Sequence, residues 1–234
     1  DTSQSMAAED LSPNRLTVAK TTVKEFISKR QTDQIGLVVF GAEAFTQCPL
    51  TIDYSILFNL LDDVHISMVG DGTAIGTSII TALNRLKDSK AKSKVMILLT
   101  DGENNQGEVD PQKAAQFAKN LGIKIYTIGI GQEGGARIPY MHPLYGKIYS
   151  DTNTYLDEDT LKYIAKTTNA FYFRAKDTAS LNNIYEKINE LETSEIKVQE
   201  YTNSTDLFIY GLYIILALFL IELLLYNVLF VVAP

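Results

Sequence analysis

The chain has 234 residues, of which 46% are hydrophobic, 21% are charged and 10% are aromatic. This is the composition of a globular protein with one sizeable core, and it excludes a disordered or disulfide-stapled chain. The formal net charge of -7 argues against nucleic-acid binding, because a phosphate-binding surface needs clustered lysine and arginine. The single cysteine, Cys48, cannot form an internal disulfide, so we interpret it as a structural thiol.

Apolar, β-branched runs alternate with amphipathic helical stretches over residues 1–200. The predicted strands are 35–40, 95–100, 123–130 and 170–174, with an edge or antiparallel strand at 44–50. The predicted helices are 12–30, 54–64, 75–86, 111–121, 158–167 and 178–191. Strict alternation implies right-handed crossovers, so we expect an α/β fold with a doubly wound, mostly parallel sheet and helices on both faces. Such sheets bind ligands outside the carboxyl ends of their strands.

Local signals mark helix starts and one irregular segment. Ser12 followed by Pro13 is typical of the start of the first helix, and Asp157 and Asp177 are predicted caps of later helices. Residues 131–151 are rich in glycine, proline and tyrosine, and within them the pattern predicts a hairpin that decorates the domain. The tyrosines of this hairpin either form a patch for a partner or pack on the domain.

The sharpest change in composition comes at residues 207–233, which are apolar except for Glu222, Asn227 and a few tyrosines. About 20 helical residues cross the hydrocarbon of a bilayer, so this run predicts a transmembrane helix that anchors the chain. A buried core helix is the alternative, and Glu222 is either functional or close to the far interface. The predicted organisation is a domain at 1–194, a linker at 195–206 and the membrane helix at 207–233.

Oxygen-bearing side chains gather in three loops, each placed where a strand should end. They are Asp1, Ser3 and Ser5 in the first loop, Thr73 in the second and Asp101 in the third. Side chains alternate with period two in an extended segment, so the three residues of the first loop can point the same way. Mg²⁺ prefers near-octahedral oxygen ligands and retains water, which suits hydroxyls combined with few carboxylates. We therefore expect a Mg²⁺ site, with Mn²⁺ or Ca²⁺ as alternatives, although Ca²⁺ would favour more carboxylates.

The joint pattern resembles the metal-ion-dependent adhesion site of von Willebrand factor A domains, whose fold is Rossmann-like. The resemblance rests on Asp-x-Ser-x-Ser at the start, a threonine after Gly-Asp-Gly, and a strand that ends in Leu-Thr-Asp-Gly. It implies that Ser3, Ser5 and Thr73 are direct ligands, and that Asp1 and Asp101 act directly or through water. A sixth position then stays open for a carboxylate of a partner protein, which implies ligand capture and not an enzyme. Gln4 stands where relatives often carry glycine, a change that removes no ligand.

The chain starts at Asp1 without an apolar strand ahead of the first loop. We therefore expect the central strand of the sheet to be absent, and residues 1–234 to be a fragment of a longer protein.

Within the family, the chain most resembles the membrane-anchored aerotolerance-operon branch, the Bat proteins, and among them the BatA type. The segments that carry this resemblance are 5–10, 13–16, 71–76, 156–161, 172–175 and 195–198. It implies a protein of the bacterial inner membrane with a periplasmic domain. It also implies partners, namely other Bat proteins and a MoxR-type AAA+ ATPase, and a role in stress tolerance or envelope maintenance.

Two other readings stay open. A Mg²⁺-dependent phosphatase with an aspartyl nucleophile also places an aspartate at a strand end, but it usually needs a second acid two residues later, where this chain has Ser3. The sequence also lacks a Gly-x-Ser-x-Gly elbow and a phosphate-binding Gly-x-x-x-x-Gly-Lys loop. The second alternative is a structural subunit with a vacant metal site.

Overall fold

The computed structural model describes residues 1–132, 136–142, 144–152, 156–202 and 208–229. The chain divides into two compact units, Asp1–Glu190 and Leu191–Pro234. The first unit holds the sheets and most of the helices, and the second holds the end of one long helix and one further helix.

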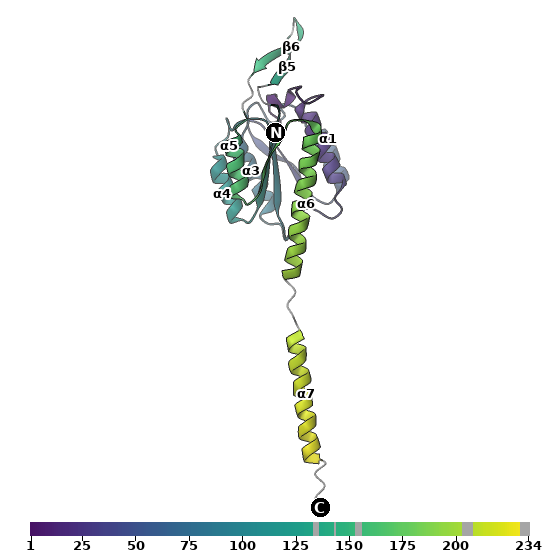
Figure 1. Ribbon diagram of the computed structural model, residues 1–234. Coiled ribbons are helices and arrows are strands. Elements are labelled where there is room, and N and C mark those ends of the chain that lie inside the picture. Colours follow the sequence, from purple (N-terminus) through teal and green to yellow (C-terminus); the bar gives the residue numbers. More distant parts are fainter. Residues whose placement is uncertain (133–135, 143, 153–155, 203–207, 230–234) are drawn as a thin grey trace, which may run out of the picture. The chain divides into compact units, whose positions relative to one another are not determined.

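A three-stranded parallel sheet forms the centre of the first unit (Figure 1). Its order is β3 (Val95–Thr100), β4 (Lys124–Ile130) and β7 (Tyr172–Ala175), and both pairings are parallel. Strand β4 is the middle strand and is almost wholly buried, which explains why its sequence is an apolar run with no polar face. The prediction of a parallel α/β sheet is thereby confirmed.

A separate antiparallel pair consists of β1 (Ile35–Phe40) and β2 (Ala44–Thr51), as the antiparallel prediction for 44–50 requires. Among the described residues, β1 and β3 are not hydrogen-bonded to each other as strands. Two residues link their carboxyl ends instead. The backbone nitrogen of Asp1 donates to the Leu99 carbonyl oxygen at 3.3 Å, and that of Thr2 donates to the Phe40 carbonyl oxygen at 2.7 Å.

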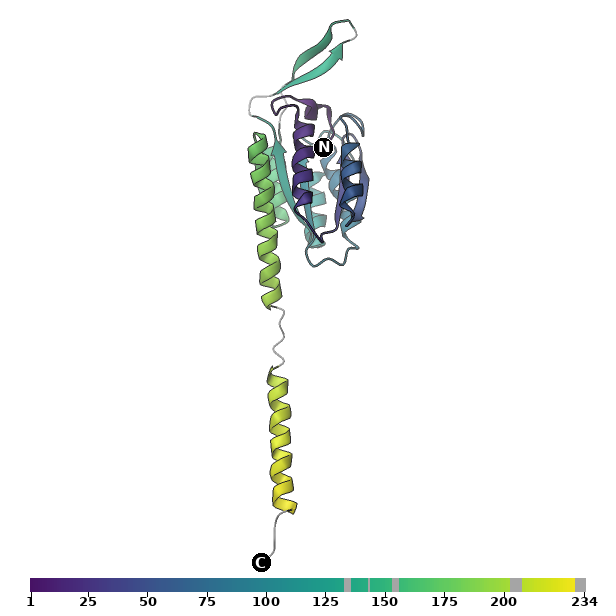
Figure 2. The same ribbon diagram turned by 90° about the vertical axis from the view of Figure 1, so that its right-hand side faces the viewer.

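Helices cover both faces of the strands, as Figures 1 and 2 show. On one side lie α3 (Ile75–Leu86), α4 (Pro111–Asn120) and α5 (Glu158–Thr167). Their apolar faces join the strands in the main core. The fully buried members of this core include Ile75, Ile79, Ala114, Ala115, Ile125, Leu161 and Ile164.

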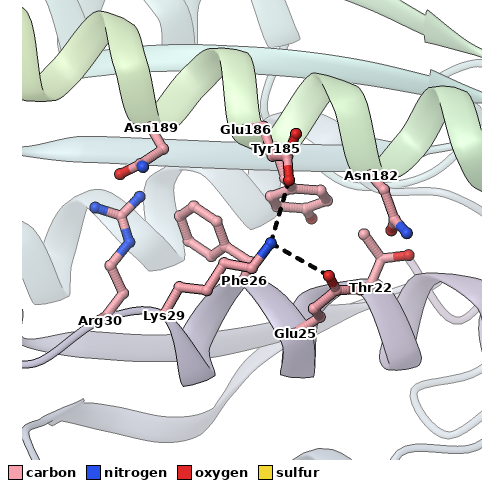
Figure 3. Close-up of a pocket in the computed structure, with 9 residues that line it drawn as sticks. All are labelled: Thr22, Glu25, Phe26, Lys29, Arg30, Asn182, Tyr185, Glu186 and Asn189. Atoms are coloured by element: carbon pink, nitrogen blue, oxygen red, sulfur yellow. Dashed lines mark hydrogen bonds and ion pairs between the residues drawn. The ribbon is translucent and has the colours of Figure 1, made fainter.

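On the other side lie α1 (Arg15–Ser28) and the first part of α6 (Thr178–Thr202). The rings of Phe26 and Tyr185 are 5.0 Å apart between centroids and join these two helices. Figure 3 shows a small hollow beside them, with a volume of about 30 Å³. Thr22 and Asn182 each contribute a buried oxygen without a hydrogen-bond partner among the described residues.

A smaller core lies under α2 (Tyr54–Asp62), where Leu57 packs with Ile27 and Cys48. Cys48 is 1% exposed, as expected for a structural thiol. The Asp53 side chain caps α2 by accepting hydrogen bonds from two backbone N–H groups.

The predicted helix over 12–30 starts too early. Helix α1 begins at Arg15 because the Asn14 side chain accepts a hydrogen bond from the backbone N–H of Thr17 at 2.8 Å, which makes Asn14 the cap. The predicted caps Asp157 and Asp177 are confirmed. They accept from the backbone N–H groups of Thr160 at 3.0 Å and Ser180 at 2.7 Å.

The hairpin predicted within residues 131–151 is confirmed. It consists of β5 (Ala136–His142) and β6 (Gly146–Thr152), paired from Ala136↔Thr152 to His142↔Gly146. The hairpin is labelled in Figure 1 and forms a sheet of its own.

Helix α6 is longer than the helix predicted for residues 178–191. Helix α6 continues to Thr202, so residues 195–202 of the predicted linker are helical, whereas 203–206 lie outside the described residues. The predicted membrane helix at 207–233 corresponds to α7 (Phe208–Leu229), and residue 207 and residues 230–233 lie outside the described ones. Across the described ranges, no helix combines the length and the apolar character needed to cross a membrane.

Candidate metal centre

The three predicted loops meet beside the carboxyl ends of β1 and β3. Ser5 belongs to the short helix η1 (Gln4–Ala7), and Ser3 directly precedes it. Asp101 follows the last residue of β3, and Thr73 lies two residues before α3. The end of β3 places Asp101 at the edge of the sheet where open α/β folds bind their ligands. The backbone of the first loop is hydrogen-bonded to the ends of β1 and β3 and lies at the same edge.

Four of the five predicted residues belong to a continuous set of polar contacts. The hydroxyl oxygens of Ser3 and Ser5 are 2.9 Å apart, and the Ser5 hydroxyl donates to Asp101 Oδ1 at 2.7 Å. Asp1 Oδ1 accepts from the backbone N–H of Ser3 at 2.8 Å, and its Oδ2 accepts from the Thr100 hydroxyl at 2.5 Å. The donors of the first and third loops thus lie within hydrogen-bond distance of one another.

Thr73 joins this group from the second loop. A methyl group placed on Gly102 would lie 3.3 Å from Thr73 Oγ1, so the threonine hydroxyl packs against the residue next to Asp101. Asn105 holds the Thr73 backbone by accepting from its N–H at 2.8 Å and donating to its carbonyl at 3.1 Å. Sequence reasoning missed Asn105, since its loop carries no periodic pattern that marks the contact.

Arg15 is the second residue that sequence reasoning missed, and it lies directly behind the site. Its Nη1 donates to Asp101 Oδ2 at 2.7 Å. Its Nε and Nη2 donate to the two carboxylate oxygens of Asp10, both at 2.8 Å. Arg15 is 1% exposed. The sequence did contain a signal for it: Arg15 lies on the same helical face as the buried Ala19 and Thr22. An arginine on a buried face needs a buried acidic partner.

Burial and neighbouring charges have opposite effects on the pKa values of Asp101, Asp10 and Arg15. Burial raises the pKa of Asp101 above its ordinary value, and the charge of Arg15 and the hydrogen bond from Ser5 act against that rise. Burial also acts to raise the pKa of Asp10, but hydrogen bonds from Arg15 and from the backbone of Gln132 outweigh it and lower this pKa. Burial acts to lower the pKa of Arg15, but its two acidic partners outweigh it, so the guanidinium stays charged.

The donor set fits a hard divalent cation. It consists of three hydroxyls and two carboxylates, all of them oxygen donors of the kind that Mg²⁺ and Mn²⁺ prefer. Among the described residues, no group of three or more His, Cys, Asp and Glu side chains is placed to hold a metal ion. A cation at this edge of the sheet would therefore depend on serine and threonine hydroxyls.

Fold and site together define a class of protein. Residues 1–187 match the von Willebrand factor type A domain family, and the chain belongs to that family. In proximal thread matrix protein 1 from the mussel byssus, a structure of the same fold is described with a zinc-occupied metal-ion-dependent adhesion motif. That structure has a TM-score of 0.59, is 24% identical, and the match covers 80% of this chain and 43% of that one.

More similar structures are bacterial. BatB from Bacteroides thetaiotaomicron has a TM-score of 0.70 and 30% identity, over 82% of this chain and 96% of that one. An aerotolerance-related membrane protein from Bacteroides fragilis has the same TM-score of 0.70 and 30% identity, over 81% and 94% of the two chains. The resemblance to aerotolerance-related Bat proteins is confirmed at this level, whereas the closer likeness to BatA stays a prediction.

A relative that matches most of the chain comes from Borreliella burgdorferi and is described as an uncharacterized protein. It is 33% identical over 210 residues, which cover 89% of this chain and 61% of the relative. The chain thus spans about three fifths of the length of this relative.

Proposed function

We propose that the chain is a binding module that captures an acidic side chain of a partner protein through a divalent cation. Asp1, Ser3, Ser5, Thr73 and Asp101 would hold the cation, and when bound it supplies a Lewis-acidic position for the partner's carboxylate. The proposal rests on one observation: three hydroxyls and two carboxylates from three loops lie together at one edge of the sheet.

The charge distribution of the chain supports capture of an anion. Asp101 directs one oxygen to Arg15 and the other to Ser5, so a cation of the chain itself already balances its charge. Asp1 is the remaining carboxylate of the donor set, and its two oxygens accept hydrogen bonds from Ser3 and Thr100. A divalent cation in such surroundings keeps an excess positive charge, which favours a further carboxylate ligand.

Mg²⁺ is the cation we propose, with Mn²⁺ as a close substitute. Both accept hydroxyl and carboxylate oxygens and keep part of their water shell. Ca²⁺ prefers more carboxylates than the two that the five residues provide.

The proposal extends to location and partners. The B. fragilis neighbour is described as an aerotolerance-related membrane protein, and residues 207–233 of this chain are strongly apolar. We place the protein at the bacterial inner membrane with its domain in the periplasm, together with other Bat proteins and a MoxR-type AAA+ ATPase. Separation of membrane and soluble fractions, with and without residues 191–234, tests the location.

We propose binding and not catalysis. A phosphatase with Asp1 as nucleophile would need an acid in the place of Ser3, whose hydroxyl lies 2.9 Å from that of Ser5. An assay with p-nitrophenyl phosphate and Mg²⁺ separates the two: turnover that Asp1→Asn abolishes would favour the enzyme.

Metal-dependent thermal stability tests the proposal. The full chain should melt at a higher temperature with Mg²⁺ or Mn²⁺ than with a chelator, because a ligand at about 100 times its Kd stabilises the folded state by about 2.7 kcal/mol. Asp1→Ala and Thr73→Ala should lose this shift. Thr21→Ala, at an exposed position of α1, is the matched control and should keep it. Unchanged melting of the unaltered chain with metal would reject metal binding and would favour a structural subunit with a vacant site.

A further inference from the structure

We infer that Arg15 is a positioning residue of the metal site, which sets the affinity for a divalent cation by fixing how Asp101 presents its carboxylate. The inference rests on the proposed function and concerns a residue outside the five metal donors. Three features of the structure support the inference: the hydrogen bonds of the guanidinium, the residues that pack against it, and the orientation in which it holds Asp101.

The guanidinium is held by two carboxylates at once. Its Nε and Nη2 make a bidentate contact with Asp10, at 2.8 Å each, and Nη1 reaches Asp101 Oδ2 at 2.7 Å. A planar guanidinium matches a carboxylate in this paired geometry, whereas a lysine ammonium can satisfy only a point contact. The plane of Arg15 is thus determined by Asp10, and Nη1 is aimed at Asp101.

The surroundings prevent the guanidinium from shifting. A methyl group on Gly131 would lie 2.5 Å from Arg15 Nη2 and 2.7 Å from its Cζ, so the backbone of Gly131 lies directly against the guanidinium. Asp10 is held in turn by the backbone N–H groups of Leu11 at 3.1 Å and Gln132 at 2.9 Å. The start of α1, the segment between η1 and α1, and the segment after β4 therefore lie together behind the site.

This support determines the orientation of Asp101. With Oδ2 on Arg15, the other oxygen, Oδ1, faces the Ser5 hydroxyl and the donor set. The Asp101 side chain is 0% exposed, so bulk solvent does not reach these oxygens. Without the guanidinium, the carboxylate would lose its partner on the buried side and would be free to rotate.

Arg15 also carries a positive charge, which by itself would weaken cation binding by repulsion. Substitutions can separate this effect from positioning. Arg15→Lys keeps the charge and loses the paired geometry, whereas Arg15→Gln removes the charge as well. Asp10→Asn leaves Arg15 and Asp101 in place, weakens the contact that orients the guanidinium and removes one negative charge beside it.

The experiment measures Mn²⁺ affinity of the full chain by electron paramagnetic resonance, which distinguishes free from bound Mn²⁺. Arg15→Lys should bind about 10- to 100-fold more weakly, the usual range when a residue behind a metal ligand is altered. Asp10→Asn should weaken binding in the same direction, and the spectrum of bound Mn²⁺ should change in both. Arg30→Lys is the matched control, because Arg30 is largely buried and ion-paired with Asp33, beyond the other end of α1 from Arg15.

The outcomes separate the two proposals. Unchanged affinity in Arg15→Lys, together with tighter binding in Arg15→Gln, would show that Arg15 acts through its charge and would overturn the positioning role alone. Absence of Mn²⁺ binding by the unaltered chain would overturn the proposed function and this inference together. Melting of each variant in chelator reports whether it folds. If Arg15→Lys does not fold, Asp10→Asn decides the question, and normal Mn²⁺ affinity in a folded Asp10→Asn would overturn the positioning role.

Discussion

Arg15 and Asp101 form an ion pair across 86 residues of sequence, with 2.7 Å between Nη1 and Oδ2. Their side chains are 1% and 0% exposed. The pair joins the first residue of α1 to the residue that follows β3, so it contributes to the stability of the fold as well as to the geometry of the site.

Arg15→Met should therefore destabilise the protein strongly. Removing one partner of a buried ion pair leaves the other charge without compensation, which costs about 3 to 5 kcal/mol in free energy of unfolding. Urea denaturation measures this loss. Lys24→Met is the control, since Lys24 pairs with Asp62 in an exposed contact, and its loss should be below about 1 kcal/mol. Equal losses in the two variants would contradict the role given to burial.

Gly76→Ala should destabilise the protein although alanine normally favours a helix. A methyl group at Gly76, in the first turn of α3, would lie 1.9 Å from the carbonyl oxygen of Val109. That contact is with backbone, so the segment before α4 must move, and we expect a loss of about 1 to 3 kcal/mol. Asn84→Ala, at an exposed position of the same helix, should be neutral or stabilising by a few tenths of a kcal/mol. Thermal melting of both variants checks the difference in sign.

The stability of the protein should depend on pH through Glu158. Hydrogen bonds from Lys162 and then from Arg174 lower the pKa of Glu158, with burial acting in the opposite direction. Because the folded pKa lies below the unfolded one, the stabilisation is present above the unfolded value of about 4.3 and is lost as pH falls through the folded value. The difference in unfolding free energy between the unaltered chain and Glu158→Gln should therefore shrink on acidification.

Asp159→Asn is the control for this pH series, because it removes a negative charge from an exposed neighbouring position of α5. It should leave the pH dependence of the unaltered chain in place. A difference between the unaltered chain and Glu158→Gln that stays constant from about pH 6 to pH 3 would show that the ion pairs of Glu158 contribute nothing to folding.

Glu9→Ala should loosen the β5–β6 hairpin without unfolding the protein. Glu9 accepts from Lys147 at 2.6 Å and from the Tyr149 hydroxyl at 2.9 Å, which ties the segment after η1 to β6. These contacts are exposed, so global stability should change by less than about 1 kcal/mol. Hydrogen exchange of backbone amides in the hairpin should become faster. Glu25→Ala removes an exposed contact with Lys29 on α1 and should leave the hairpin unchanged.

Much of the secondary structure is predictable from local pattern. Strand β3 and helices α3 and α5 have the predicted bounds, because apolar periodicity and flanking polar residues coincide there. Boundaries that depend on a single side chain were harder, as Asn14 shows at the start of α1. The end of α6 was also missed: the prediction ended at residue 191, although no glycine or proline follows before Thr202, where the helix ends.

The sequence by itself determined the alternation of strands and helices and the family, and it predicted five oxygen-bearing residues as metal donors. Asp101 could be placed from its strand alone, since parallel strands bring their carboxyl ends to one edge. Only the tertiary structure decided what lies behind the donors. Arg15 and Asp10 on one side and Asp101 on the other meet because the start of α1 lies against the end of β3. The partner of a buried charge is the opposite charge that lies next to it in the folded protein, and the spacing of residues in the sequence does not reveal which one that is.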